Sequence, residues 1–177
     1  MLVLRTELPG VFVIEPEPNS DERGQFARTY CARVFAEHGL CTSWAQCNVS
    51  FNRHAGTLRG LHWQAPPHEE VKLVRCTAGA AFDVVADVRP DSPTYRKWVA
   101  VELTAGGRRA VYIPGGYAHG FQALADGTEL FYQMSAFYAP DAARGARWDD
   151  PALGIDWPAC AGRVIAPRDL SFPDLPT

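Results

Sequence analysis

Two histidines in apolar stretches are the first side chains of this sequence that could do chemistry. His62 lies in "TLRGLHWQ" (residues 57–64), three residues after Arg59. His119 lies in "YIPGGYAHGF", three residues after a Pro-Gly-Gly turn. An imidazole can act as a general base near neutral pH, bind a metal ion, or pack in a barrel wall with its hydrogen bonds satisfied. The residues alone leave all three roles open for His62.

Period-two alternation predicts which other ionisable side chains face inward. In "VKLVRCT", Lys72 shares a face with Val74, so an inward-facing lysine is expected. In "AAFDVVADV", Asp83 and Asp87 share one face, which either meets water or lines a polar cavity. Tyr132, in "ELFYQMSAFY", is an aromatic residue that by itself indicates only packing.

Strand phase also bears on the spacing between Arg59 and His62. A regular strand would put these two side chains on opposite faces, so both could not reach one ligand. Gly60 lies between them and favours a bulge or twist that brings both to one side.

Short apolar stretches between turn residues predict that β-strands position these side chains. The chain holds 15 glycines and 14 prolines, and the stretches between them are rich in Val, Phe, Tyr and Trp. One short helix is expected within residues 31–40, with Gly39 as its stop. After Tyr138, recurring proline and aspartate predict a long, packed connection. The pattern is typical of an all-β sandwich or barrel with ten strands: 11–15, 24–30, 43–51, 57–64, 70–77, 80–88, 97–104, 108–113, 119–124 and 129–136.

Length, charge and cysteine content bound the organisation and the partners. A chain of 177 residues is close to the usual size of one domain, so a single domain over 1–177 is expected. The net charge of −3 gives no electrostatic case for nucleic acid. No apolar run approaches the roughly 18 residues of a membrane span. Five cysteines without a CxxC pair favour neither a disulfide framework nor a thiolate zinc site, so a cytoplasmic location is expected.

Six ordered motifs over nearly the whole chain resemble those of the nucleotide-sugar 3,5-epimerases typified by dTDP-4-dehydrorhamnose 3,5-epimerase. They are "DERGQF" (21–26), "QCNVS" (46–50), "LRGLHWQ" (58–64), "KLVRCTAGAAFDVVADVRPDSPTY" (72–95), "YIPGGYAHGF" (112–121) and "DDPALGIDWP" (149–158). The resemblance implies a cupin-like antiparallel β-barrel (jelly roll) with one or two short helices, usually as a homodimer. It also implies an enzyme that acts on a dTDP-4-keto-6-deoxyhexose without metal or organic cofactor.

The implied reaction explains why these residue types are needed. A proton on C3 or C5 of a 4-keto sugar is acidic because the ketone delocalises the carbanion as an enolate. Inversion then needs a base and an acid on opposite faces of the sugar. The resemblance makes His62 the base, oriented by Asp169 of "APRDLSF", and Tyr132 the acid. Lys72 would stabilise the oxyanion that develops at C4.

A second set of residues matches the family's substrate contacts. By resemblance, arginines bind the pyrophosphate, His119 contacts the sugar and Tyr138 stacks on the nucleobase. Many relatives have glutamate where this chain has Arg28 and Ala143, two positions expected on the nucleotide and phosphate side. The implied binding set is Arg23, Gln46, Asn48, Arg59, His119, Tyr138 and Arg168.

Two other interpretations stay open. A metal-binding cupin, either a dioxygenase or a small-molecule sensor, would take its ligands from His62, His68 or Glu69, and His119. Strand phase does not make these side chains converge. A monoepimerase that inverts only C3 or only C5 would use the same catalytic residues as a 3,5-epimerase, because regiochemistry depends on how the sugar sits.

Overall fold

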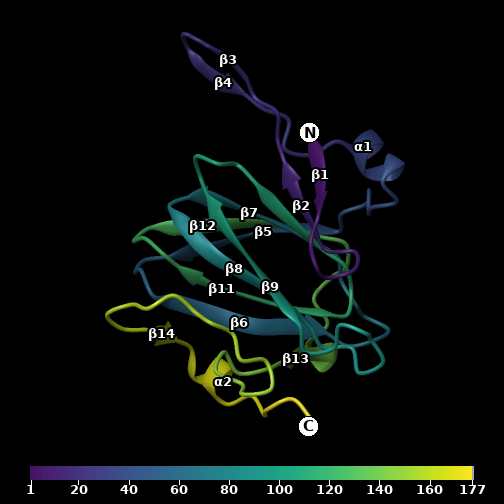
Figure 1. Ribbon diagram of the computed structural model, residues 1–177, viewed down its shortest axis with the longest axis vertical. Helices are drawn as coiled ribbons and strands as arrows, with labels where there is room; N and C mark the ends of the chain where they lie inside the picture. Colours follow the sequence, from purple (N-terminus) through teal and green to yellow (C-terminus); the bar gives the residue numbers. More distant parts are fainter. Residues whose placement is uncertain (177) are drawn as a thin grey trace.

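Two antiparallel β-sheets stacked on each other form the body of the protein in the computed structural model, which describes residues 1–176 (Figure 1). The first sheet has six strands in the order β1-β2-β10-β7-β12-β5. Its strands are β1 (Leu2–Arg5), β2 (Phe12–Glu15), β5 (Gln46–Asn52), β7 (Lys72–Ala78), β10 (Ala110–Ile113) and β12 (Thr128–Met134).

The second sheet has the order β13-β6-β11-β8-β9, and β14 adds to β6 in parallel. Its central strands pair over long registers, which makes β6, β11 and β8 a rigid platform for side chains. Its strands are β6 (Thr57–Gln64), β8 (Ala80–Asp87), β9 (Trp98–Thr104), β11 (Tyr117–Ala123), β13 (Ala143–Gly145) and β14 (Val164–Ile165).

A two-stranded hairpin projects away from the body at the top of Figure 1. It consists of β3 (Asn19–Asp21) and β4 (Gly24–Phe26). Residues 1–176 also contain three short helical segments: α1 (Ala32–Glu37), the 3-10 helix η1 (Pro140–Ala142) and α2 (Pro167–Leu170). No helix among residues 1–176 is long and apolar enough to cross a membrane.

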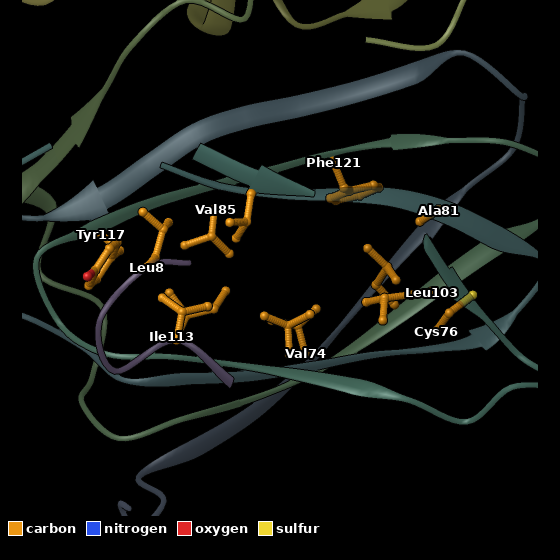
Figure 2. Close-up of a cluster of buried hydrophobic side chains, with 13 residues drawn as sticks. Leu8, Val74, Cys76, Ala81, Val85, Leu103, Ile113, Tyr117 and Phe121 are labelled. Atoms are coloured by element: carbon orange, nitrogen blue, oxygen red, sulfur yellow. The ribbon is translucent and has the colours of Figure 1, made fainter. Parts of the chain in front are cut away.

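Apolar side chains from both sheets fill the space between them. Figure 2 shows Phe121 and Val85 of the second sheet pointing toward Val74 and Ile113 of the first, with Leu103 beside them. All five are at most 3% exposed. Burying such side chains supplies most of the favourable free energy of folding, so this core fixes the spacing of the two sheets.

The faces predicted for the ionisable residues are observed. Lys72 is 5% exposed and shares its buried face with Val74, as predicted. Asp83 and Asp87 are at most 1% exposed, so their face of β8 points into the protein and not to water. The interior between the sheets is therefore apolar in one part and carries charged groups in another.

The predicted all-β architecture is confirmed, and each of the ten expected strands overlaps an observed one. β6 has the predicted bounds, and α1 is followed by Gly39 with φ +68°, as expected for a helix stop. The expected strand 24–30 is too long, because the chain leaves the hairpin after Phe26 and leads to α1. The sequence did not predict β1, β3, β13 or β14.

Candidate active site

A cleft of about 360 Å³ opens between the two sheets. Strands β5, β7 and β12 form one wall, and β6 and β11 form the other. Phe121 belongs both to the lining of the cleft and to the apolar core, so the cleft borders directly on the core. Eight of the predicted site residues line it: Asn48, Arg59, His62, Lys72, His119, Tyr132, Tyr138 and Arg168.

Positive charge dominates the lining of the cleft. Arg59, Lys72, Arg144 and Arg168 contribute cationic groups, whereas Glu70 contributes the one carboxylate of the lining. Guanidinium groups bind phosphate oxygens in pairs and stay charged at all physiological pH values. The cleft is therefore suited to an anionic ligand such as a diphosphate.

His62 and Asp169 form a hydrogen-bonded pair at one wall of the cleft. His62 Nε2 lies 2.8 Å from Asp169 Oδ1, and Gly60 N–H donates to Asp169 Oδ2 at 3.1 Å. Because an ionised carboxylate can only accept, Nε2 carries the proton and Nδ1 keeps a free lone pair. Burial alone would raise the pKa of Asp169, but the hydrogen bonds from His62 and Gly60 outweigh it and lower that pKa. Asp169 therefore stays ionised, and when the imidazole of His62 is neutral its free Nδ1 can accept a proton.

Short elements near the C-terminus hold this pair in place. Asp169 lies on α2, which Pro167 starts in its first turn, where the missing N–H costs nothing. Phe172 follows α2 and packs its ring edge-on against His62, with 5.8 Å between centroids. A Cβ on Gly145 would come within 2.3 Å of the Phe172 ring, so only glycine leaves room for this contact.

Gly60 resolves the phase conflict between Arg59 and His62. In the pairing of β6 with β11, His62 lies opposite His119 and Arg59 lies opposite Phe121, so the register shifts between them. Gly60 has φ +114°, a conformation that side chains rarely adopt. The predicted bulge is confirmed, and both Arg59 and His62 line the cleft.

Tyr132 comes from the opposite sheet. It lies on β12 and packs its ring edge-on against His119, with 5.8 Å between centroids. Burial raises the pKa of Tyr132 well above its usual value, and Asp83 raises it further while Arg59 acts in the opposite direction. The phenol is therefore protonated, which is the state that a general acid needs.

Lys72 and Glu70 form a buried ion pair at the same wall as Tyr132. Lys72 Nζ lies 3.1 Å from Glu70 Oε1 and donates to the backbone oxygen of His62 at 3.2 Å. Both side chains are 7% exposed. These contacts aim the ammonium group into the space between β7 and β6, where a developing negative charge would be stabilised most.

A second histidine–carboxylate pair lies deeper in the cleft. His119 Nε2 is 2.8 Å from Asp83 Oδ2, and both side chains are at most 5% exposed. The structure thus pairs Asp83 with His119 and Asp169 with His62, so each histidine has its own carboxylate.

Two predicted binding residues are not brought to the lining of the cleft. Arg23 lies on the projecting hairpin, with its side chain 85% exposed and paired with Asp21 at 2.6 Å. Arg23 does not line the cleft of its own chain, because the hairpin points away from the body (Figure 1). Gln46 lies just behind the lining, where its Nε2 is 3.7 Å from Sδ of Met134.

The position of Arg28 also differs from expectation. Ala143 lines the cleft, whereas Arg28 is exposed in the segment that follows the hairpin and does not line the cleft. Side chains that the sequence did not single out complete the site: Gln64, Glu70, Arg144 and Phe172. Strand phase could have indicated Glu70 and Gln64, which lie an even number of residues from Lys72 and His62.

The ligand set of a metal-binding cupin is not assembled. Within residues 1–176, no group of three or more His, Cys, Asp or Glu side chains is arranged to hold a metal ion. His62 and His119 face each other across β6 and β11, yet each imidazole binds its own carboxylate. The arrangement fits the proton-transfer interpretation, in which His62 and Asp169 act as a pair.

A sequence profile of the dTDP-4-dehydrorhamnose 3,5-epimerase family matches residues 5–176. The chain belongs to this family. A dTDP-4-dehydrorhamnose 3,5-epimerase of Shigella flexneri is 43% identical over 172 residues, which cover 97% of this chain and 94% of the relative. The family membership indicated by the six motifs is thereby confirmed.

Two solved structures of epimerases are similar along nearly their whole length. The dTDP-6-deoxy-D-glucose-3,5-epimerase of Legionella pneumophila, solved with dTDP-4-keto-L-rhamnose, is 35% identical with a TM-score of 0.93, covering 98% of this chain and 92% of that one. ChmJ, a 3′-monoepimerase of Streptomyces bikiniensis solved with dTDP-quinovose, is 35% identical with a TM-score of 0.92, covering 97% and 87%. The cupin-like fold that the family implies is confirmed by these similarities.

Proposed function

We propose that this protein is an isomerase that inverts C3 and C5 of a dTDP-4-keto-6-deoxyhexose, converting dTDP-4-dehydro-6-deoxyglucose to dTDP-4-dehydrorhamnose. One observation carries the proposal. A base paired with a carboxylate, His62, stands on one sheet, and a protonated phenol, Tyr132, stands on the facing sheet of the same cleft. Inversion at a carbon requires this arrangement, because the proton must leave from one face and return to the other.

In the proposed mechanism, the free Nδ1 of His62 removes a proton from C3 or C5 of the bound sugar. The electron pair of the C–H bond moves into an enolate whose negative charge develops at O4. Lys72 stabilises that oxyanion, and Asp169 stabilises the imidazolium formed on His62. Tyr132 then delivers a proton to the carbon from the opposite face, which restores the ketone with inverted configuration.

The nucleotide half of the ligand would be bound by a separate group of residues. Arg59 is oriented by Asn52, whose Oδ1 accepts from its Nε at 2.9 Å, and is proposed to bind the pyrophosphate together with Arg168. Tyr138 is 55% exposed at the cleft and offers a flat ring on which the nucleobase can stack. Gln46, Asn48 and His119 are proposed to contact the substrate.

The proposal is tested by NMR in deuterated water with dTDP-4-keto-6-deoxyglucose and, in parallel, its UDP counterpart. We expect deuterium at both C3 and C5, formation of the rhamno-configured product, and faster turnover of the dTDP form. With His62→Ala, the sugar should take up no deuterium, while the affinity of the variant for dTDP stays within a few-fold of wild type. Retained exchange in His62→Ala would remove this residue from the base role.

A 3-monoepimerase is the second candidate function. The observation that favours it is that ChmJ, named a 3′-monoepimerase, is as similar to this chain as the Legionella 3,5-epimerase is. Both reactions need the same base, acid and oxyanion contact. Deuterium confined to C3 of the product in the experiment above would select this candidate.

We also propose that the chain forms a homodimer. Apolar side chains remain exposed on the edge strand β5 and on the projecting hairpin: Val49 is 57%, Phe51 56% and Phe26 76% exposed. An unpaired strand edge with apolar residues is usually covered in the native assembly. Light scattering coupled to size-exclusion chromatography should give twice the chain mass, and a monomer at micromolar concentration would contradict the proposal.

The cytoplasm is the proposed compartment. All five cysteines, Cys31, Cys41, Cys47, Cys76 and Cys160, are free thiols, which suits a reducing environment. Fractionation of producing cells should recover the protein with cytoplasmic markers, and recovery with an exported fraction would overturn this assignment.

A further inference from the structure

Gln64 is a cleft residue to which the proposed mechanism gives no task. It is the last residue of β6, is 3% exposed and lines the cleft. Its side-chain amide makes three hydrogen bonds to the backbone. Oε1 accepts from the N–H of Ala139 at 2.6 Å, while Nε2 donates to the oxygens of His68 at 2.8 Å and Phe137 at 3.3 Å.

Two of these three bonds lie on either side of Tyr138. Phe137 and Ala139 are its direct neighbours in the chain, so one buried amide holds the backbone before and after this residue. Burial does not hold the aromatic rings of this segment, because Phe137 is 72% and Tyr138 55% exposed. The segment lies beyond the end of β12 at Met134, where no ladder of strand hydrogen bonds fixes it.

We infer that Gln64 is a positioning residue that fixes the backbone around Tyr138 and thereby pre-organises the Tyr138 ring for the nucleobase. The inference rests on the proposed function, which assigns the nucleobase to Tyr138. Ordering a mobile aromatic side chain during binding costs affinity, and a protein that orders it beforehand avoids this cost. The bond to His68 extends the same restraint to the loop before β7, so Gln64 joins both sides of the cleft entrance.

Only a carboxamide satisfies these contacts. One atom must accept from an N–H, and the other must donate to two carbonyl oxygens. In Gln64→Met the side chain keeps its length but loses all three bonds. In Gln64→Glu the bond to the N–H of Ala139 can persist, but an oxygen that cannot donate faces the oxygens of His68 and Phe137.

The test is a double-mutant cycle on the affinity for dTDP, measured by calorimetry with wild type, Gln64→Met, Tyr138→Ala and the double variant. We expect Gln64→Met to weaken dTDP about tenfold in the wild-type background and less than twofold in the Tyr138→Ala background. Gln64→Glu should weaken dTDP at least as much as Gln64→Met. Inorganic pyrophosphate, which has no base to stack, should bind wild type and Gln64→Met within twofold of each other.

A matched control is available on the neighbouring strand. Gln122 on β11 is 1% exposed; its Nε2 donates to the oxygen of Pro158 and its Oε1 accepts from Nε of Arg163, so neither bond is to the segment around Tyr138. Gln122→Met should therefore leave dTDP affinity within twofold of wild type. Equal weakening of dTDP by Gln64→Met in both backgrounds, or equal loss of pyrophosphate, would overturn the positioning role.

The kinetic readout separates this inference from the proposed function. With the dTDP-4-keto sugar, Gln64→Met should raise KM about tenfold and change kcat less than threefold. Calorimetry with dTDP needs no turnover. An enzyme that fails to epimerise the sugar but shows the expected coupling would refute the proposed reaction and leave the role of Gln64 intact.

Discussion

Replacing Asp169 by asparagine removes one charge behind His62 and leaves the size of the side chain unchanged. In wild type, Asp169 accepts from two donors, Nε2–H of His62 at 2.8 Å and N–H of Gly60 at 3.1 Å. An asparagine has one oxygen and one NH₂ group, so it can satisfy only one of these donors. If its oxygen turns to Gly60, the NH₂ group faces His62 and selects the tautomer with the proton on Nδ1, which cannot act as the base.

The opposite orientation keeps the correct tautomer but leaves the buried N–H of Gly60 unsatisfied, at a cost of about 1–3 kcal/mol. The competent orientation is therefore a minority of the molecules. Within that minority, the imidazolium keeps a hydrogen bond to the amide oxygen but loses its ion pair with the carboxylate, which costs about 1.5–3 kcal/mol. The two effects together raise the barrier by about 2.5–6 kcal/mol, which slows proton removal by roughly 10²- to 10⁴-fold.

The assay is the initial rate of deuterium uptake into dTDP-4-keto-6-deoxyglucose, with dTDP affinity measured in parallel. Asp169→Asn should bind dTDP within threefold of wild type while exchange falls by the predicted factor. Asp83→Asn is the matched control, since Asp83 makes an equally short bond to His119. A rate for Asp169→Asn within tenfold of wild type, or a larger loss in Asp83→Asn, would show that Asp169 does not control the tautomer of His62.

Three further predictions concern the charges and the backbone around the site. Lys72→Met combined with Glu70→Gln removes the buried ion pair without leaving an unpaired carboxylate. The double variant should lower kcat about 10²- to 10³-fold with dTDP binding retained. A loss of kcat below fivefold would exclude Lys72 as the residue that stabilises the oxyanion. At Asp87, burial alone would raise the pKa, but hydrogen bonds from neighbouring Arg, Ser and Thr side chains outweigh it and lower the pKa from 3.8 to about 2. The lowered pKa stabilises the folded protein by about 2 kcal/mol above pH 4, and this contribution is lost as the pH falls toward 2. Urea unfolding at several pH values should show this loss of stability in wild type and not in Asp87→Asn. The same dependence of stability on pH in both proteins would contradict this role of Asp87. Gly60→Ala would put a Cβ 2.6 Å from a backbone atom of the neighbouring strand β11 and should lower the free energy of unfolding by about 3–5 kcal/mol. Gly24 also has a positive φ but has nothing within 4 Å, so Gly24→Ala should lower it by at most about 1–3 kcal/mol. Equal losses in the two variants would show that the close approach at Gly60 is unimportant.

Strand phase alone predicted much of the site's geometry. The inward face of Lys72 and the bulge at Gly60 follow from alternation and from one glycine, because neighbouring residues in a strand determine both. The pairing of Asp169 with His62 has no such local signal. It joins residues 107 positions apart, and only the family motif indicated it.

Other features depend on contacts between distant segments and were missed for that reason. The amide of Gln64 acts on backbone groups about 75 residues further along the chain, and no pattern within β6 reveals them. β13 and β14 have three and two residues, too short to show an alternation, and exist because they pair with β6. The sequence of the hairpin that carries Arg23 has the pattern of an ordinary turn, which does not indicate that the hairpin projects from the body.

The proposal that groups on opposite sheets remove and return the proton is best tested by deuterium uptake into the sugar in the presence of Tyr132→Phe. In this variant His62 can still remove a proton from the sugar and return deuterium from solvent to the same face. We expect dTDP-4-keto-6-deoxyglucose to gain deuterium with its configuration retained, while inversion falls by at least 10²-fold. Inversion at the wild-type rate, or loss of deuterium uptake together with inversion, would contradict it.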